Sequence, residues 1–321
     1  MRSARYERMT KILADPDVML RVAERIGRFE LGTRDTRPGD ASESFAPRQR
    51  AALQAHASYF RERYFESGSS VAGIEPLLQH AVFIEASKHL YGRTHVRPVS
   101  VWANLLLPGQ KIALHTDVPE FRGMRRGKEP DWLLVAMHHS GLFDDWRISA
   151  ATIVICFGSE PAGGEFVFYP DGPYGRSVAA PAEPNTGILF DAESVYHGVD
   201  SLARKNTSLP ELTPRVALRY GGDGAWVLDD DHSEMARYRW EDVRYAVAWK
   251  AHCFADAAEE TKVREHTRDI SRQRVLEVLR DDLNSRGRGG DAPRDETQLA
   301  QRIFENYVKF PPARPSTAAG R

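Results

Sequence analysis

Two histidines and one aspartate have the types and spacing needed to bind a metal ion. One residue separates His115 from Asp117, and His197 follows much later in the chain. Two imidazoles and one carboxylate form a ligand set typical of non-haem Fe(II), which leaves positions open for a co-substrate and dioxygen. Residues i and i+2 of a β-strand point to the same side, so His115 and Asp117 can reach one ion while Thr116 faces away. The spacing therefore predicts a strand ending at the site, and a second strand that brings His197 beside it.

Short apolar segments around these residues predict the strands of a β-sandwich or closed barrel. The expected strands are residues 99–107, 111–115, 151–157, 165–169, 188–190, 194–199 and 214–220. Pro108-Gly109 and Gly163-Gly164 supply the turns between some of them. Taken alone, His115 and Asp117 would more simply be a hydrogen-bonded pair at a strand end. The strands and the later histidine favour the metal site.

Several motifs in one order resemble the prolyl-4-hydroxylase-like Fe(II)/2-oxoglutarate oxygenases. Residues 104–117 resemble the first metal-binding hairpin of that family, and Gly163-Gly164-Glu165-Phe166 resembles its Gly-Gly-Glu turn. Residues 187–199 resemble the segment that carries the distal histidine. The joint order is more specific than any single motif. The resemblance covers residues 95–222 and implies an α+β fold, with a double-stranded β-helix (jelly-roll or cupin-like) core between N- and C-terminal helices.

The resemblance also assigns the metal and co-substrate residues. It implies His115, Asp117 and His197 as ligands of Fe(II), with 2-oxoglutarate and O2 as co-substrates. A basic residue on the last strand should anchor the C5 carboxylate of 2-oxoglutarate. Arg215 is predicted for this role because the guanidinium fork pairs bidentately with a carboxylate. Asn104 is assigned to co-substrate binding. Arg204 and Lys205, in the polar loop before that strand, remain alternatives to Arg215, and Leu106 replaces a tyrosine often found in the family.

The substrate is expected to meet residues near the metal triplet and on the last strand. Pro119 to Gly123 is similar to a segment of free-amino-acid hydroxylases and halogenases, which implies that Glu120 meets an ammonium group and Arg122 a carboxylate. Trp132 would add an aromatic wall. Arg219 is expected to meet a substrate acid group or the C1 carboxylate of 2-oxoglutarate; a solvated strand face is the alternative.

The implied reaction is hydroxylation of a C–H bond in a small metabolite, such as an amino acid or a natural-product intermediate. 2-Oxoglutarate would be decarboxylated to succinate and CO2. The carboxylate of Asp117 favours this over halogenation, because related halogenases carry a small residue there. Two alternatives stay open: hydroxylation of a peptide or protein side chain, and a non-catalytic metal-binding β-barrel.

Composition predicts a soluble cytoplasmic enzyme. The formal net charge of −1 gives no overall attraction to nucleic acid, and no segment has the length and apolarity of a membrane span. The two cysteines, Cys156 and Cys253, predict no disulfide framework. We expect a small-molecule substrate, with no nucleic-acid or membrane partner.

The chain is expected to form one compact catalytic unit in four segments. Residues 1–94 would be a helical support region, 95–230 the catalytic core, 231–310 a helical region and 311–321 a disordered tail. The expected helices are residues 15–29, 47–65, 73–91, 241–260, 264–284 and 296–308. The C-terminal helices could cover one end of the barrel, contact the substrate or form a homodimer surface.

Overall fold

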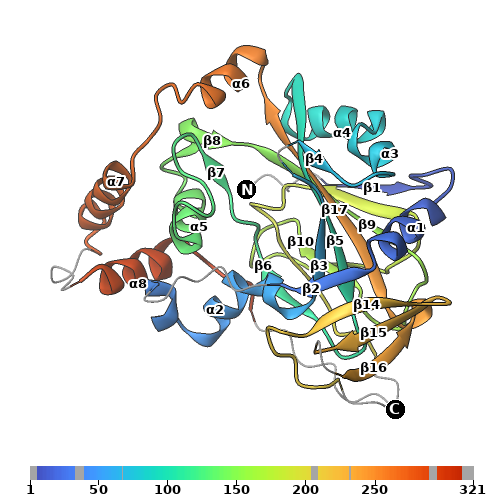
Figure 1. The fold of residues 1–321 in the computed structure, drawn as a ribbon. Coiled ribbons are helices and arrows are strands. Elements are labelled where there is room, and N and C mark those ends of the chain that lie inside the picture. Colours follow the sequence, from blue (N-terminus) through green and yellow to red (C-terminus); the bar gives the residue numbers. More distant parts are fainter. Residues whose placement is uncertain are drawn as a thin grey trace.

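Antiparallel sheets dominate the computed structural model (Figure 1), which describes residues 6–32, 40–66, 68–203, 209–230, 233–288 and 295–312. The large sheet has the strand order β1-β12-β9-β17-β5-β3-β2-β14-β15-β16, with β4 beside β3. In that order, its strands are β1 (Tyr6–Thr10), β12 (Thr186–Phe190), β9 (Ala150–Phe157), β17 (Arg244–Phe254), β5 (His95–Leu106), β3 (Phe60–Glu66), β2 (Arg28–Leu31), β14 (Ala217–Gly222), β15 (Ala225–Asp229), β16 (Glu234–Arg239) and β4 (Ser69–Ser70).

A smaller sheet carries the histidines of the predicted metal site. Its order is β11-β10-β13-β6, formed by Val178–Ala180, Phe166–Tyr169, Tyr196–Val199 and Ile112–His115. A separate pair joins β7 (Glu120–Phe121) to β8 (Arg147–Ile148). The chain passes repeatedly between the large and small sheets, from β5 to β6, from β9 to β10 and from β12 to β13. This path brings distant segments together at one place.

Strand β17 occupies the centre of the large sheet, where the sequence predicted a helix over residues 241–260. That prediction is wrong: β17 pairs with β5 along one edge and with β9 along the other. Tyr245, Val247 and Trp249 point into the core, and the intervening residues face the opposite side of the sheet. Alanine-rich composition favours a helix, but burial between two strands overrides that preference. The core strands thus extend past the predicted boundary at residue 230.

Eight α-helices and four 3₁₀ helices lie in the described part of the chain. The α-helices are α1 (Asp17–Ile26), α2 (Pro47–Leu53), α3 (Glu75–Leu78), α4 (Ala81–Tyr91), α5 (Asp131–Ser140), α6 (Ala257–Arg264), α7 (Arg272–Ser285) and α8 (Glu296–Tyr307), and the 3₁₀ helices are η1 (Ala41–Ser44), η2 (Ala55–Ser58), η3 (Asp144–Trp146) and η4 (Trp240–Asp242). The helix predicted over residues 47–65 ends early, because Phe60 and Tyr64 are buried as part of β3.

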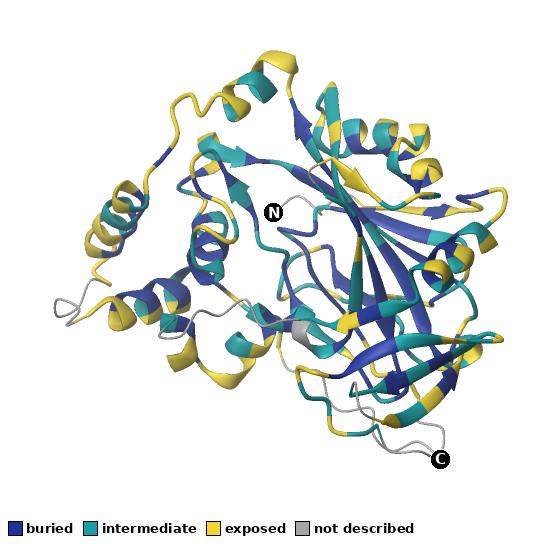
Figure 2. Ribbon diagram, viewed as in Figure 1, coloured by how far each residue is buried: buried dark blue, intermediate teal, exposed yellow. Residues whose placement is uncertain are grey.

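Two main hydrophobic cores hold the molecule together. The larger one packs α1 and α4 against one face of the large sheet. The second joins α5, α7 and α8 and includes Phe45 and Trp132. Figure 2 shows the central strands as mostly buried, whereas α7 keeps an exposed outer face. No helix among the described residues is both long and apolar enough to span a bilayer. Arg204, Lys205 and residues 313–321, on which some predictions fell, lie outside the described residues.

Candidate metal centre and co-substrate pocket

The two predicted histidine ligands stand opposite each other on adjacent strands. His115 on β6 pairs in register with His197 on β13. Nδ1 of His115 lies 2.8 Å from the carbonyl of Ala113, and Nδ1 of His197 lies 2.9 Å from the carbonyl of Val195. A carbonyl can only accept, so each Nδ1 donates its proton and each Nε2 keeps a free lone pair. This arrangement is common in histidines that bind metals.

Asp117 brings one carboxylate oxygen to both Nε2 atoms. Its Oδ1 lies 3.8 Å from Nε2 of His115 and 3.7 Å from Nε2 of His197. The backbone N–H of Asp117 donates to the carbonyl of Ala192 and fixes the chain beyond β6. Nε2 of His115 is buried and has no hydrogen-bond partner among the described residues. A buried polar atom without a partner is costly, and a divalent cation bound by the three side chains would satisfy it.

A third histidine, His56 in η2, lies near the same place. His56, His115 and Asp117 each offer a ligand atom within 4.8 Å of the others. However, Nδ1 of His56 is engaged with the hydroxyl of Tyr59 at 2.6 Å, whereas Nδ1 of His197 contacts a backbone carbonyl just as Nδ1 of His115 does. His197 therefore matches His115 in orientation, and His56 lines the adjacent wall of the cavity. No spacing pattern in the sequence pointed to His56.

The protonation states suit metal binding. Burial, and then the neighbouring His197, lower the pKa of His115 to about 3. Burial also lowers the pKa of His197. Burial opposes ionisation of Asp117, but Lys250 and the two histidines hold its pKa well below the usual range. At neutral pH the site therefore offers two neutral imidazoles and one carboxylate, the forms in which these groups bind cations.

Gly198 permits the close strand contact on which the site depends. A Cβ atom at this position would lie 2.7 Å from the carbonyl oxygen of Ile112 on β6. Any larger residue would push β13 away from β6. Glycine follows His197 for a steric reason: only a residue without a side chain fits between β13 and β6 at position 198.

A cavity of about 1020 Å³ opens onto the three ligands. It lies between the sheets and is lined by β5, β9 and β17 on one side and by β6 and β13 on the other. The predicted co-substrate residue Asn104 lines it, as does Thr152. Asn104 Oδ1 and Thr152 Oγ1 are buried and lack hydrogen-bond partners among the described residues. The cavity walls are therefore equipped for a polar ligand.

Arg244, the first residue of β17, also lines this cavity. The residue is only 1% exposed. Its Nε donates to the carbonyl of Gly164 at 2.9 Å, and an Nη donates weakly to Cys156 Sγ at 3.5 Å. Among the described residues no carboxylate pairs with it. Buried arginines are ordinarily paired with an anion, so Arg244 marks a place for a negatively charged group.

The structure does not bring the predicted anchor Arg215 to the site. Arg215 is exposed in a turn before β14 and does not line the cavity. Arg219, on β14, forms an ion pair with Asp229 at 2.7 Å, also away from the cavity. Strand β14 belongs to an added antiparallel segment, β14 to β16, that follows β13 and extends the large sheet. Its alternating pattern predicted a strand at the site, whereas the structure places β17 along the cavity.

The remaining predicted substrate residues separate into two groups. Glu120 lines the cavity, with Oε2 3.8 Å from Nε2 of His252. Arg122 instead donates to the carbonyl of Asp145 and does not line the cavity. Trp132 is 2% exposed within the second hydrophobic core. Trp132 lies in α5, whose apolar residues pack against α8.

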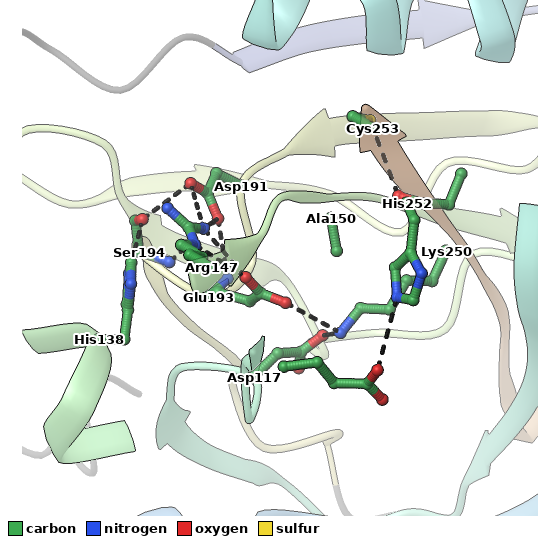
Figure 3. A network of polar contacts seen from close by, with 12 residues as sticks. Asp117, His138, Arg147, Ala150, Asp191, Glu193, Ser194, Lys250, His252 and Cys253 are labelled. Carbon is green, nitrogen blue, oxygen red and sulfur yellow. Dashed lines mark hydrogen bonds and ion pairs between the residues drawn. The ribbon is translucent and has the colours of Figure 1, made fainter. Parts of the chain in front are cut away.

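A network of ion pairs adjoins Asp117, as Figure 3 shows. Lys250 Nζ is 3.0 Å from Asp117 Oδ2 and 4.0 Å from Glu193 Oε1. Arg147 pairs with Glu193 at 3.0 Å and with both oxygens of Asp191 at 2.9 Å. Arg244 and Lys250 lie six residues apart on one face of β17, an alternation that could have revealed this strand from the sequence.

The adjacent histidines His138 and His139 show no shared metal site. They lie in the last turn of α5. His138 Nε2 is 2.9 Å from Ser194 Oγ, which places it at the edge of the ion-pair network. Burial lowers the pKa of His138 to about 3 and that of His139 to about 4. Both are neutral parts of the protein interior.

Comparison with known proteins gives structural neighbours. No protein family and no curated protein matches the sequence. Among solved structures, the chain is similar to an oxidoreductase of the 2OG-Fe(II) oxygenase family from Burkholderia pseudomallei, at 13% identity and a TM-score of 0.35, covering 60% of this chain and 65% of that one.

Two further neighbours cover more of both chains. One is a prolyl hydroxylase from Trichoplax adhaerens in complex with a hypoxia-inducible-factor peptide fragment, at 10% identity and a TM-score of 0.41, covering 82% of this chain and 87% of that one. The other is a non-heme α-ketoglutarate-dependent carbocyclase of nogalamycin biosynthesis, at 11% identity and a TM-score of 0.45, with the same coverage of 82% and 87%. These neighbours are 2-oxoglutarate-dependent enzymes.

Proposed function

We propose that this protein is an Fe(II)/2-oxoglutarate-dependent oxygenase that hydroxylates a C–H bond of a small polar metabolite. The observation that carries the proposal is the convergence of His115 Nε2, His197 Nε2 and Asp117 Oδ1 at the wall of a cavity. Two histidines and one carboxylate with room beside them suit non-haem Fe(II). An ordinary buried ion pair would not leave Nε2 of His115 without a partner.

The strand order supports a double-stranded β-helix as the core. Strands β12, β9, β17 and β5 are neighbours in the large sheet, and β11, β10, β13 and β6 form the small sheet. Along the chain these eight strands wind between the two sheets, as in a jelly roll. The N-terminal strands β2 and β3 and the segment β14 to β16 then extend the large sheet.

Arg244 takes the role that the sequence had assigned to Arg215. Its buried guanidinium would pair with the C5 carboxylate of 2-oxoglutarate, and its bond to Gly164 holds it in place. Asn104 on β5 pairs with Ala246 of β17, and Thr152 on β9 pairs with Lys250 of β17. The side-chain oxygen atoms of Asn104 and Thr152 have no hydrogen-bond partner among the described residues. Asn104 also has an amide donor, so the pair can orient the co-substrate by hydrogen bonds.

The outer part of the cavity suits a small molecule that carries charge. Arg61 on β3 stacks on Trp102 of β5, with its guanidinium carbon 3.9 Å from the ring centroid. Arg61 Nε is buried without a hydrogen-bond partner among the described residues. Glu120 and Glu129 line the same cavity, so both signs of charge are available. We propose a polar, charged metabolite as the substrate, with Arg61 contacting its acidic group.

Fe(II) bound at this site would supply the activation of O2, which is the oxidant: one oxygen atom would go to succinate as 2-oxoglutarate loses CO2, and the other would enter the substrate C–H bond as the hydroxyl group. The chain itself orients the participants. His115, His197 and Asp117 would hold the ion on one face, Arg244 would fix the co-substrate, and the apolar residues of the two sheets would keep bulk water from the site. Hydroxylation in particular, as opposed to other oxidations, is part of the proposal.

The test is the formation of succinate from 2-oxoglutarate by the iron-loaded protein. We expect slow formation without substrate and faster formation with one member of a panel of amino acids, small acids and peptides. Stimulation by peptides alone would favour side-chain hydroxylation of a protein. Tight metal binding with no succinate under any condition would favour a non-catalytic binding module instead.

A further inference from the structure

Lys250 divides the two carboxylate oxygens of Asp117 between separate contacts. Oδ1 faces both Nε2 atoms at 3.7–3.8 Å, and Oδ2 lies 3.0 Å from Lys250 Nζ. We propose that Lys250 is a positioning residue that fixes Asp117 as a ligand through Oδ1 alone, and that the ion pairs behind it tie Asp117 to the segment that carries His197. The inference rests on the proposed iron site.

The position of Lys250 is itself well fixed. It lies on β17 between β5 and β9, in register with Ser100 and Thr152, and its side chain is 22% exposed. Its Nζ lies 3.0 Å from Asp117 and 4.0 Å from Glu193, so its position is set by contacts to both side chains.

A chain of contacts continues from Lys250 to the turn before β13. Glu193, only 2% exposed, receives Arg147 at 3.0 Å on its other oxygen. Arg147 also holds Asp191, whose Oδ2 accepts a hydrogen bond from Ser194 Oγ at 2.8 Å. This turn contacts Asp117 directly, because the carbonyl of Ala192 accepts the N–H of Asp117 at 2.8 Å.

The same turn leads directly into β13, and the carbonyl of Val195 orients His197. The network therefore contacts the carboxylate ligand from two sides and borders the strand of the distal histidine (Figure 3). The network thus holds Asp117 and the start of the strand that carries His197 in fixed positions relative to each other.

Two physical effects of Lys250 on metal binding oppose each other. A carboxylate whose Oδ2 is held by an ammonium group presents only Oδ1 to an ion, which leaves more coordination positions for a co-substrate. Outer contacts of this kind commonly contribute 10–100-fold to metal affinity. Against this, a positive charge near a cation weakens its binding. The proposal requires that positioning outweighs repulsion.

The experiment measures the Kd of Mn(II), as an oxidation-resistant probe, for the metal-free full-length protein without 2-oxoglutarate. Lys250→Met removes both the donor and the charge, and Lys250→Arg keeps both. We expect Lys250→Met to weaken Mn(II) binding about 10–100-fold and Lys250→Arg to remain close to wild type. Lys88→Met is the matched control, because Lys88 also pairs with a glutamate but lies on α4, away from the cavity.

Equal or tighter Mn(II) binding by Lys250→Met would show that repulsion dominates, and would overturn the positioning role while leaving the proposed function intact. A wild-type protein that binds no Mn(II) would overturn the proposed function and this inference with it. If Lys250→Met does not fold, Lys250→Gln replaces it, since its amide keeps a neutral donor. Its affinity for Mn(II) should fall below that of wild type, and an affinity equal to or above wild type would again contradict the inference.

Discussion

At the scale of single residues, the site is defined by atoms whose ordinary partners are missing. His115 Nε2, Asn104 Oδ1 and Thr152 Oγ1 all lack hydrogen-bond partners among the described residues and border one cavity. Arg244, buried beside them, has no carboxylate partner in the same part of the structure. A folded protein rarely leaves so many buried polar groups unpaired. A cation and an anionic co-substrate would satisfy them together.

Asp117→Ala should abolish succinate formation and strongly weaken metal binding. The substitution removes the carboxylate that lies within 4 Å of both Nε2 atoms, so the ion would keep two neutral imidazole ligands. The measurement is Mn(II) affinity alongside 2-oxoglutarate turnover. Asp145→Ala, at an exposed position, should behave as wild type. Full turnover by Asp117→Ala would remove the basis for the iron site.

Arg244→Gln should mainly raise the requirement for 2-oxoglutarate. A hydrogen-bonded contact to a charged group contributes about 1.5–3 kcal/mol, which corresponds to roughly 10–150-fold in Kd. The Kd of 2-oxoglutarate for the Mn(II)-loaded protein measures this. Arg215→Gln is a matched control at the exposed position and should leave the Kd unchanged. If Arg215→Gln raised the Kd of 2-oxoglutarate and Arg244→Gln did not, Arg215 would be the anchor.

At the scale of elements, β17 decides how the molecule is organised. One face contributes Tyr245, Val247 and Trp249 to the core, and the other presents Arg244 and Lys250 to the cavity. The strand links the co-substrate anchor to the support of the metal ligands through one rigid backbone. The two roles depend on its extended conformation, since a helix would turn these two side chains in different directions.

Trp249→Ala should therefore destabilise the protein strongly. Trp249 is fully buried, and removing a core tryptophan costs about 3–5 kcal/mol. Ala248→Ser, the adjacent residue that faces the cavity, should change stability by less than about 1 kcal/mol. The free energy of unfolding of both variants, measured in urea, tests whether residues of β17 alternate between the core and the cavity. Similar losses at the two positions would argue against the strand.

At the scale of the whole molecule, buried neutral histidines should make the protein sensitive to acid. Burial lowers the pKa values of six histidines below that of an exposed imidazole: His56, His115, His138, His139, His197 and His252. Below about pH 6.5 the unfolded chain binds protons at these residues before the folded protein does. The free energy of unfolding then falls as the pH decreases, by about 1.4 kcal/mol per pH unit for each such histidine.

The urea midpoint of the metal-free protein, measured from pH 7 to pH 4.5, should accordingly decrease. Glu193 acts in the opposite direction: burial raises its pKa to about 8, so its contribution to stability is full at low pH and is lost as the pH rises towards that value. One carboxyl cannot offset six imidazoles. A midpoint that stays constant over this range would contradict the burial of neutral histidines.

The predicted homodimer and the cytoplasmic location stay predictions.

The local parts of the site could be predicted from the sequence. His115 and Asp117 fall at the end of a strand, and the apolar runs and turns around them gave β6, β9, β10, β12 and β13 near their observed places. Alternation and turn chemistry depend on neighbouring residues, so the sequence alone was sufficient there. Glu120 and Asn104, close in the chain to these strands, also reach the cavity.

The long-range parts were decided only by the tertiary structure. Arg244 and Lys250 lie in a segment whose alanines suited a helix, and only its place between β5 and β9 makes it a strand. The strand predicted at residues 214–220 lies largely in β14, away from the cavity, and it drew the anchor prediction to Arg215. Which strand enters the centre of a sheet depends on the burial that its neighbours provide, and composition alone does not record those neighbours.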